Sequence, residues 1–270
     1  MFQIIVPFLY IISGVALAVT RLSQFSRRSN ILLVTVFTVC LAGLIWHCQM
    51  LFNLIFLSNG ITLSLSNTAS FIGLQLALIA IIGAIEPSLR GLSSGLLLLA
   101  AAATSVTSSQ VLTNTGELVT WQMQMQMHIF ISLFAYGLLT VGAIVAIYAL
   151  IQDRRLHARK LSTINQLFAP LETTERLLYG IAGAGFFTLF IAILSGFTFV
   201  DNLFAQHLVH KTFLSILALV LFGILLAGRQ FANWRGRRTI LLYLWGFIIL
   251  CLAYFGSRYI LEEILDRSWG

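Results

Sequence analysis

Four histidines of this sequence lie at or near the ends of long apolar stretches, where an imidazole could bind a metal. In "AQHLVHKTF", residues 205–213, His207 and His210 are three positions apart and Lys211 follows. Two residues at this spacing share one face of a helix. Neutral imidazole is an axial ligand for haem iron and also binds zinc and copper. Both histidines could approach one ion, or one could ligate it while the other orients the site.

The composition indicates that membrane helices carry these histidines. The 270 residues are 59% hydrophobic and 9% charged, with a mean hydropathy of +0.95, whereas soluble domains carry about 25% charged residues. Because a spanning helix needs about 20 apolar residues, we predict an all-α integral membrane protein. It would form one transmembrane domain over 1–270, a bundle of about eight helices. The predicted spans are 2–20, 31–52, 67–85, 92–108, 124–151, 177–200, 211–228 and 239–261.

The distribution of basic residues predicts the orientation. Thirteen of the 16 lysines and arginines fall in the loops 21–30, 86–91, 152–176 and 229–238. Basic loops stay on the cytoplasmic side, so both termini are expected outside. The same residues are expected to contact anionic lipid headgroups. The first span has no basic start or evident cleavage site, and we expect it to be a retained helix.

This orientation predicts a cofactor or metal site at the outer face. His47 and His128 lie in the second and fifth predicted spans, His207 and His210 directly precede the seventh, and all four would lie on the outer side. Ionisable residues in spans usually face the bundle interior, and imidazole is the least costly of them to bury because it can be neutral. His128 and His210 are the first candidates as metal ligands, His47 is next and His207 last. The alternative for each is an ordinary hydrogen-bonding or interfacial role.

Several other classes of protein are excluded or disfavoured. Neither GxxxxGK[ST] nor GxGxxG occurs, so we expect no nucleotide binding. The net charge of +7 follows from membrane topology and does not indicate a nucleic-acid partner. The three cysteines form no CxxC motif and are expected to be packing residues. The run Ala100–Ala103 in the fourth span predicts close contact with another helix.

The stretch "WQMQMQMH", residues 121–128, alternates methionine with glutamine. In an extended chain Met123, Met125 and Met127 would share one face and could bind Cu(I), which prefers soft ligands. In a helix the alternating residues share no face. We favour a helix start, with Trp121 as an interfacial aromatic residue.

Two stretches resemble a known family. "HIFISLFAYGLLTVGAIVAIYALIQDRR", residues 128–155, resembles the histidine-led helix of the cytochrome c assembly family, with Ser132 and Tyr136 as its serine and tyrosine pair. Residues 210–258 look like the family's closing helical hairpin, whose inner turn is a Trp-Arg-Gly-basic stretch, here 234–238. The resemblance covers about 120–262, and the whole chain looks most like the small, eight-span, HemX-like or YpjD-like branch. It implies a bacterial inner (cytoplasmic) membrane, and His128 matches a histidine that the family uses for haem.

One departure from the family keeps two functions open. Haem-handling members carry a tryptophan-rich segment of the type WGxxWxWDPKE before the hairpin, and this sequence has "VDNLFAQHLVHKT" there. The first hypothesis is a protein that binds or hands on haem, holds its iron axially and is not an enzyme. Lys211 and Arg258 would then contact haem propionates, although Arg258 could instead pair with Glu262 one helical turn on.

Two alternatives do not involve haem. The first is an accessory or regulatory membrane subunit that acts through a protein partner, for example beside a metal-ion transporter. The second is a transporter in its own right, for which Glu86 at the inner end of the third span is the acidic residue to test. Few charged residues lie in mid-span, and no paired broken helices are evident, so the transporter ranks third.

Overall fold

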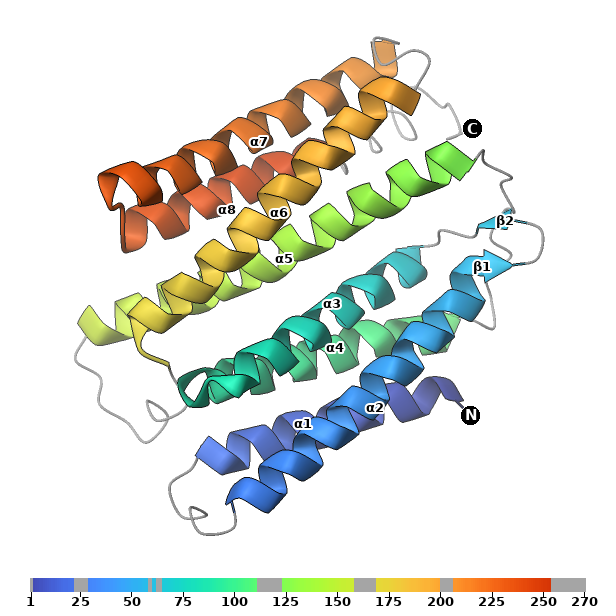
Figure 1. The fold of residues 1–270 in the computed structure, drawn as a ribbon, viewed down its shortest axis with the longest axis vertical. Helices are drawn as coiled ribbons and strands as arrows, with labels where there is room; N and C mark the ends of the chain where they lie inside the picture. Colours follow the sequence, from blue (N-terminus) through green and yellow to red (C-terminus); the bar gives the residue numbers. More distant parts are fainter. Residues whose placement is uncertain are drawn as a thin grey trace. The chain divides into compact units, whose positions relative to one another are not determined.

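The computed structural model describes residues 2–21, 29–57, 60–61, 65–110, 123–157, 169–199 and 206–253 (Figure 1). These residues form eight α-helices, and the all-α prediction is confirmed. The helices are α1 (Phe2–Arg21), α2 (Ser29–Ile55), α3 (Leu65–Ile85), α4 (Arg90–Gln110), α5 (Met123–His157), α6 (Leu171–Phe199), α7 (Gln206–Ala232) and α8 (Arg237–Cys251). A 3-10 turn, η2 (Pro87–Leu89), precedes α4, and the two-residue strands β1 (Phe56–Leu57) and β2 (Gly60–Ile61) pair antiparallel after α2.

Five of the described helices are long and apolar enough to cross a membrane. These stretches are Ile31–Asn53, Asn67–Ile85, Met123–His157, Leu171–Thr198 and Lys211–Ala232, and Ile4–Thr20 is a shorter apolar helix. Each of the eight predicted spans coincides with one helix, although the helix ends differ by a few residues. The part of the last span beyond residue 253 lies outside the described residues. The chain is therefore a multi-pass membrane protein.

The chain divides into two compact units, and each is described by itself. The N-terminal unit contains residues 1–121 and 154–174, and with them α1 to α4. The C-terminal unit contains residues 122–153 and 175–270, and with them most of α5 and α6 and all of α7 and α8.

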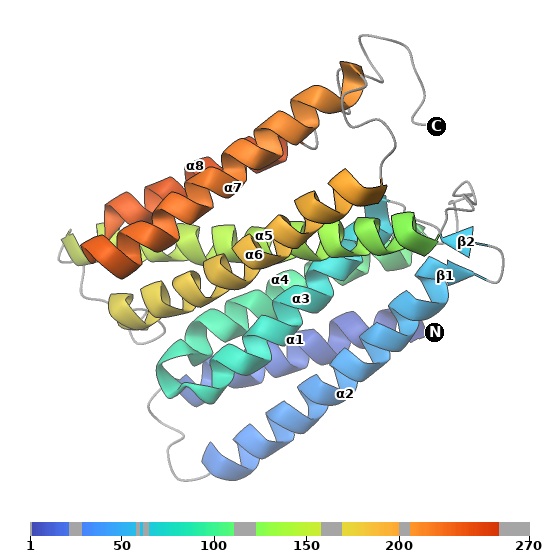
Figure 2. The ribbon, with the colours of Figure 1, turned by 45° about the horizontal axis from the view of Figure 1, so that its top comes forward.

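Small residues bring α4 close to its neighbours in the N-terminal unit. A Cβ added to Gly14 of α1 would lie 3.2 Å from the carbonyl oxygen of Ser94 in α4. A Cβ on Gly73 of α3 would lie 3.2 Å from the carbonyl oxygen of Ala100. Figure 2 shows α3 and α4 side by side. The predicted close contact at the alanine run is confirmed, because small residues let helix backbones approach in membranes.

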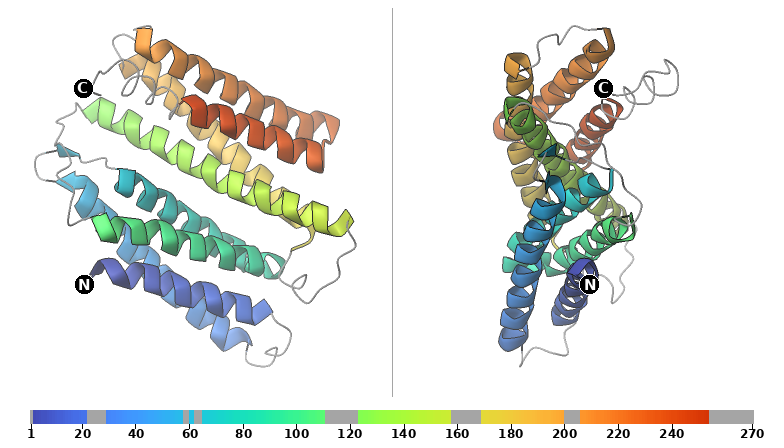
Figure 3. Two further views of the ribbon diagram at one scale, coloured as in Figure 1. Left: turned by 180° about the vertical axis from the view of Figure 1, so that it is seen from behind. Right: turned by 90° about the vertical axis from the view of Figure 1, so that its right-hand side faces the viewer.

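A buried tyrosine joins α8 to α5 in the C-terminal unit. The Tyr243 side chain is fully buried, and its hydroxyl donates a hydrogen bond of 3.0 Å to the Leu139 carbonyl of α5. Gly142 provides the space for this hydroxyl, because a Cβ there would overlap it. The Phe222 ring of α7 packs edge-on against Tyr243, and Figure 3 shows α7 and α8 side by side. Hydrocarbon offers a buried hydroxyl no partner, so this contact fixes the position of α8 against α5.

The turn between α7 and α8 is built from specific residue types. Gly236 has φ +75°, a conformation that favours glycine, and its N–H donates a hydrogen bond of 2.9 Å to the buried Glu175 carboxylate of α6. The Trp234 ring covers Gly228, where a Cβ would overlap it. The Tyr179 hydroxyl of α6 donates to the Trp234 carbonyl at 3.2 Å. Helix α6 therefore holds the turn at two points.

We expect Gly142→Ala to lower the free energy of unfolding by about 1–3 kcal/mol, because the added methyl overpacks the space that Tyr243 occupies. Gly180→Ala is the matched control, since a Cβ there meets no atom within 4 Å. It should be neutral or slightly stabilising, because alanine favours helix over glycine by about 0.5–1 kcal/mol. Unfolding in mixed detergent micelles, followed by circular dichroism, measures both. Equal stability of the two variants would contradict the proposed packing.

Candidate functional site

His128 lies near the start of α5 and is held by α6. Its Nδ1 atom is 2.8 Å from the hydroxyl oxygen of Ser195. The Ser195 hydroxyl in turn donates a hydrogen bond of 2.8 Å to the Ala192 carbonyl of its own helix. Ser195 is buried, and His128 is half-buried. One nitrogen of the His128 imidazole therefore contacts a hydroxyl group of α6, and both helices span the membrane.

The residue after Ser195 completes this contact. A Cβ added to Gly196 would lie 3.1 Å from Cε1 of the His128 ring, closer than most van der Waals contacts. Glycine at this position lets the ring edge lie directly against the backbone of α6. The hydrogen bond fixes one edge of the imidazole, and the glycine leaves room for the ring beside α6.

A cation lies near this histidine. Lys211, at the start of the apolar stretch of α7, is partly buried, and its ammonium group lies within electrostatic range of the His128 ring. An ammonium in this position carries a desolvation cost, which an anionic ligand would offset. The arrangement places an imidazole and an ammonium group within electrostatic range of each other.

His47 has a different environment in the N-terminal unit. Its Nδ1 is 3.0 Å from the Tyr10 hydroxyl of α1, and its Nε2 is 2.9 Å from the Ser70 hydroxyl of α3. All three side chains are fully buried. Both ring nitrogens are engaged, so the histidine links α1, α2 and α3. His47 and His128 belong to different units, and that they share one site stays a prediction.

The remaining predicted site residues are described only in part. His207 and His210 lie in the first turns of α7, so the helical spacing assumed for them is present, but their side chains lie outside the described residues. Arg258 lies outside them entirely. Among the residues that the structure describes, no group of three or more His, Cys, Asp or Glu side chains could hold a metal ion. Axial ligation by two histidines, His128 and His210, stays a prediction.

The alternating methionines are helical. Helix α5 begins at Met123, and the Met123 and Met127 side chains are exposed. Residues two positions apart in a helix point in nearly opposite directions, so Met125 does not share a face with Met123 and Met127. The extended arrangement that a Cu(I) site would need is not present, and the favoured prediction of a helix start is confirmed.

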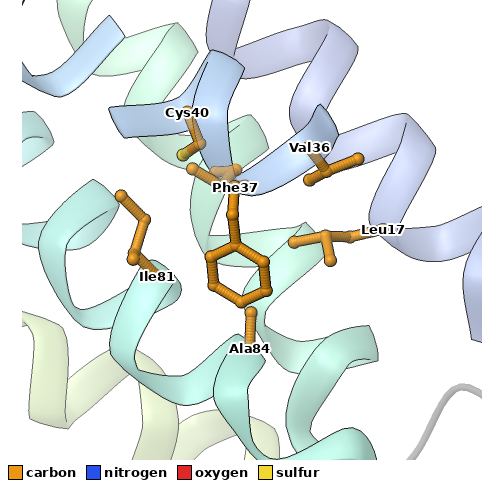
Figure 4. Close-up of a pocket in the computed structure, with 7 residues that line it drawn as sticks. Leu17, Val36, Phe37, Cys40, Ile81 and Ala84 are labelled. Carbon is orange, nitrogen blue, oxygen red and sulfur yellow. The ribbon is translucent and has the colours of Figure 1, made fainter. Parts of the chain in front are cut away.

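A small cavity of about 10 Å³ lies in the N-terminal unit (Figure 4). Its walls are apolar apart from a thiol, and the lining residues are Leu17, Val36, Phe37, Cys40, Ile81, Ala84 and Leu97. A water molecule needs at least about 10–15 Å³ and two or more polar partners. The cavity is too small for a cofactor, and Cys40 serves there as a packing residue.

Three polar or small residues that the structure places at key points were not identified from the sequence. Ser195 and Gly196 hold His128, but they lie in an apolar stretch, "LSGF", without a recognisable motif. Gln75 of α3 is 2% exposed, and neither its amide nitrogen nor its oxygen has a hydrogen-bond partner among the described residues. Gln75 is the one polar side chain in the apolar run 71–85 of α3, and this was the available signal for it.

The sequence of this chain is similar to one protein family and to several bacterial and algal proteins. Residues 8–265 match the sequence profile of the Cytochrome C assembly protein family. The chain is 36% identical to "Inner membrane protein YpjD" of Escherichia coli (strain K12) over 140 residues, 52% of this chain and 53% of that protein. It is 24% identical to "Cytochrome c biogenesis protein CcsA" of Guillardia theta over 162 residues, 54% of each chain. An uncharacterised 28.8 kDa protein of Azospirillum brasilense is 28% identical over 141 residues, 52% of each chain.

The chain thus spans about half the length of the curated relatives it matches. No solved structure matches it significantly. The predicted family resemblance is confirmed, and so is the predicted location in an inner membrane as a multi-pass protein.

We expect Tyr10→Phe and Ser70→Ala each to lower the free energy of unfolding by about 1 kcal/mol, because each leaves one nitrogen of the buried His47 ring without a partner. The loss of unfolding free energy in the double variant should differ from the sum of the two single losses by at least about 0.5 kcal/mol, since both hydroxyls act on one ring. Thr38→Val is the control, because Thr38 bonds only to the Thr35 carbonyl of its own helix at an exposed position. Strictly additive losses, measured by denaturation in micelles, would contradict the three-helix link.

Proposed function

The chain belongs to the cytochrome c assembly protein family, and we propose that it binds haem or hands it on through histidines at the outer face of a bacterial inner membrane. The observation that carries this proposal is the placement of His128. Its imidazole is held by Ser195 at the end of an apolar helix, with a lysine ammonium nearby. Family members named for cytochrome c biogenesis are among its relatives, and cytochrome c biogenesis requires haem to be delivered to an apoprotein.

We propose a topology of eight crossings with both termini outside. The predicted orientation is supported by the charge distribution, since the ends of α5 and α7 carry Arg154, Arg155 and Arg229 in their last turns. The α7–α8 turn adds exposed arginines. With these groups at the cytoplasmic leaflet, His128 and Lys211 lie at the opposite ends of their helices, toward the outer face. Anionic lipids would contact the basic turns.

The residues around His128 suit haem. Haem would supply an iron that takes imidazole nitrogen as an axial ligand and two propionates that carry negative charge. His128 offers the imidazole, and Lys211 offers a cation for a propionate. His210 immediately precedes Lys211 in α7, which makes it the first candidate for the second axial ligand, and His207 lies one helical turn before Lys211. Arg258 is a further candidate for a propionate contact.

The proposal assigns no bond-making step to this chain. The Ser195 hydroxyl and the His128 ring form a hydrogen-bonded pair, but the serine proton is directed to the Ala192 carbonyl, so the pair is not arranged as a nucleophile and its base. Binding and release of haem are the functions that this arrangement supports. The partner would be a membrane or exported protein that receives haem, and neither a nucleotide nor a nucleic acid is required.

A second candidate function is a non-haem accessory or regulatory subunit that acts through a membrane protein partner, for example beside a metal-ion transporter. Two observations favour it. The sequence lacks the tryptophan-rich segment before α7, and both nitrogens of His47 are engaged by hydroxyl groups. A transporter is less well supported, because Glu86 is exposed at the α3–η2 turn, where it accepts a hydrogen bond of 3.2 Å from Ser88.

We expect the protein, purified in detergent, to bind haemin with about 1:1 stoichiometry and to give a sharp Soret band with split bands after reduction, because two neutral imidazoles produce a low-spin centre. His128→Ala and His210→Ala should abolish this spectrum. His157→Ala is the matched control, since His157 lies at the opposite end of α5 from His128 and should bind as the unmodified protein does. Absorption spectra of the oxidised and reduced forms measure all four proteins.

Two outcomes would contradict haem binding at this site. One is the absence of stoichiometric haemin uptake by the folded protein. The other is binding that is unchanged in both His128→Ala and His210→Ala. Either result would favour the accessory-subunit function, in which the family scaffold is kept for contacts with a partner.

We also expect Lys211→Gln to weaken haemin binding about tenfold, because a hydrogen bond to a charged group contributes about 1.5 kcal/mol. Haemin dimethyl ester, which has no free carboxylates, should bind the unmodified protein and Lys211→Gln equally. Lys211→Arg keeps the charge and is the control. A Lys211→Gln defect of the same size for haemin and its ester would show that the lysine does not bind a propionate.

A further inference from the structure

We propose that Ser195 is a positioning residue that keeps the proton of the neutral His128 ring on Nδ1 and thereby leaves the lone pair of Nε2 available to a metal ion. The role given to the free nitrogen rests on the proposed haem function, whereas the assignment of the proton depends only on the contacts of Ser195 and His128. The relevant atoms are the Ser195 hydroxyl, the two ring nitrogens of His128 and the Ala192 carbonyl.

A count of protons assigns the direction of each hydrogen bond. A serine hydroxyl has one proton to donate and two lone pairs to accept with. The Ser195 hydroxyl donates that proton to the Ala192 carbonyl, at 2.8 Å. The 2.8 Å contact between Ser195 and Nδ1 of His128 can then be a hydrogen bond only if Nδ1 carries the proton. In the neutral imidazole the other nitrogen, Nε2, must then carry the lone pair.

The opposite tautomer makes fewer hydrogen bonds. If Nε2 carried the proton, the Ser195 hydroxyl would have to turn its proton toward Nδ1 and give up the bond to Ala192. The observed chain has two hydrogen bonds, from Nδ1 to Ser195 and from Ser195 to Ala192, and the alternative has one. In a membrane interior, where water does not replace a lost bond, this difference favours the Nδ1–H form.

The backbone fixes the ring as well as its proton. Gly196 lies against Cε1 of the ring, where a Cβ would be 3.1 Å away. Ser195 and Gly196 therefore act as a pair, since the first determines which nitrogen is protonated and the second leaves the space that the ring occupies. Groups that orient a metal-ligating histidine in this way typically change metal affinity by 10- to 100-fold when they are replaced.

The acceptor is a neutral hydroxyl, and this has a consequence for the bound metal. A carboxylate in the same position would raise the basicity of the ligand and favour ferric iron. A serine hydroxyl withdraws the Nδ1 proton less, so His128 stays a neutral, moderate donor. A ligand of this kind suits a haem that is bound reversibly and released to a recipient.

The test is the ring ¹⁵N NMR spectrum of the full-length protein labelled at histidine, in detergent and without haem. Protonated and unprotonated ring nitrogens have well-separated ¹⁵N shifts, and a His128→Gln spectrum identifies the His128 signals. We expect the neutral ring to be in the Nδ1–H form. In Ser195→Ala and Ser195→Cys the His128 ring should become a mixture of the Nδ1–H and Nε2–H forms. In Ser195→Thr, which keeps the hydroxyl, the ring should remain in the Nδ1–H form.

A haemin titration of the same variants is the second measurement. Ser195→Ala should weaken haemin binding by at least about tenfold, and Ser195→Thr should bind as the unmodified protein does. An Nε2–H ring in the unmodified protein, or a tautomer that is the same in Ser195→Ala, would overturn the inference. If the tautomer behaves as expected and no variant takes up haemin, the positioning role of Ser195 is supported and the proposed haem function fails.

Discussion

Hydrocarbon supplies no hydrogen-bonding partner, and this constraint explains the contacts that Tyr243, His47 and His128 make. An unsatisfied polar group in that environment costs several kcal/mol. The Tyr243 hydroxyl bonds to the Leu139 carbonyl, and the rings of His47 and His128 bond to hydroxyl groups of neighbouring helices. These contacts join helices that are otherwise held by van der Waals packing, so Tyr243, His47 and His128 each help to determine the relative position of two or three helices.

The two described membrane histidines meet this constraint in different ways. His47 has both nitrogens bonded and is fully buried, so a metal could reach it only after a hydrogen bond is broken. His128 is half-buried and has one nitrogen bonded to Ser195. The number of engaged nitrogens, rather than the presence of histidine, therefore separates a residue that stabilises the fold from one that can also ligate. The number of bonded nitrogens depends on residues of other helices, so it could not be predicted from the position of a histidine in the sequence.

The helices could be predicted from the sequence because apolar length is a property of a continuous segment. The ends of α5 and α6 were harder to predict. Helix α6, for example, begins at Leu171 with the charged sequence "LETTER", and hydropathy alone does not indicate that this sequence is helical. The partners of the histidines could not be predicted at all. Ser195 is 67 residues from His128, and Tyr10 is 37 residues from His47, so each pairing depends on how two distant helices are aligned.

The inner turn of the closing hairpin carries part of the family resemblance but contains none of the residues proposed to contact haem. The Trp-Arg-Gly-basic turn resembles the family strongly, and the structure gives its physical reason. Gly228 makes space for the Trp234 ring, and Gly236 adopts a positive φ while its N–H bonds to Glu175. These residues form a stable helical hairpin and contain no metal ligand. Loss of haem binding would therefore leave the hairpin unchanged, and the family motif would persist in a protein that works only through its partners. Substitutions of His128, His210, Ser195 and Lys211 are the tests that separate the two proposed functions.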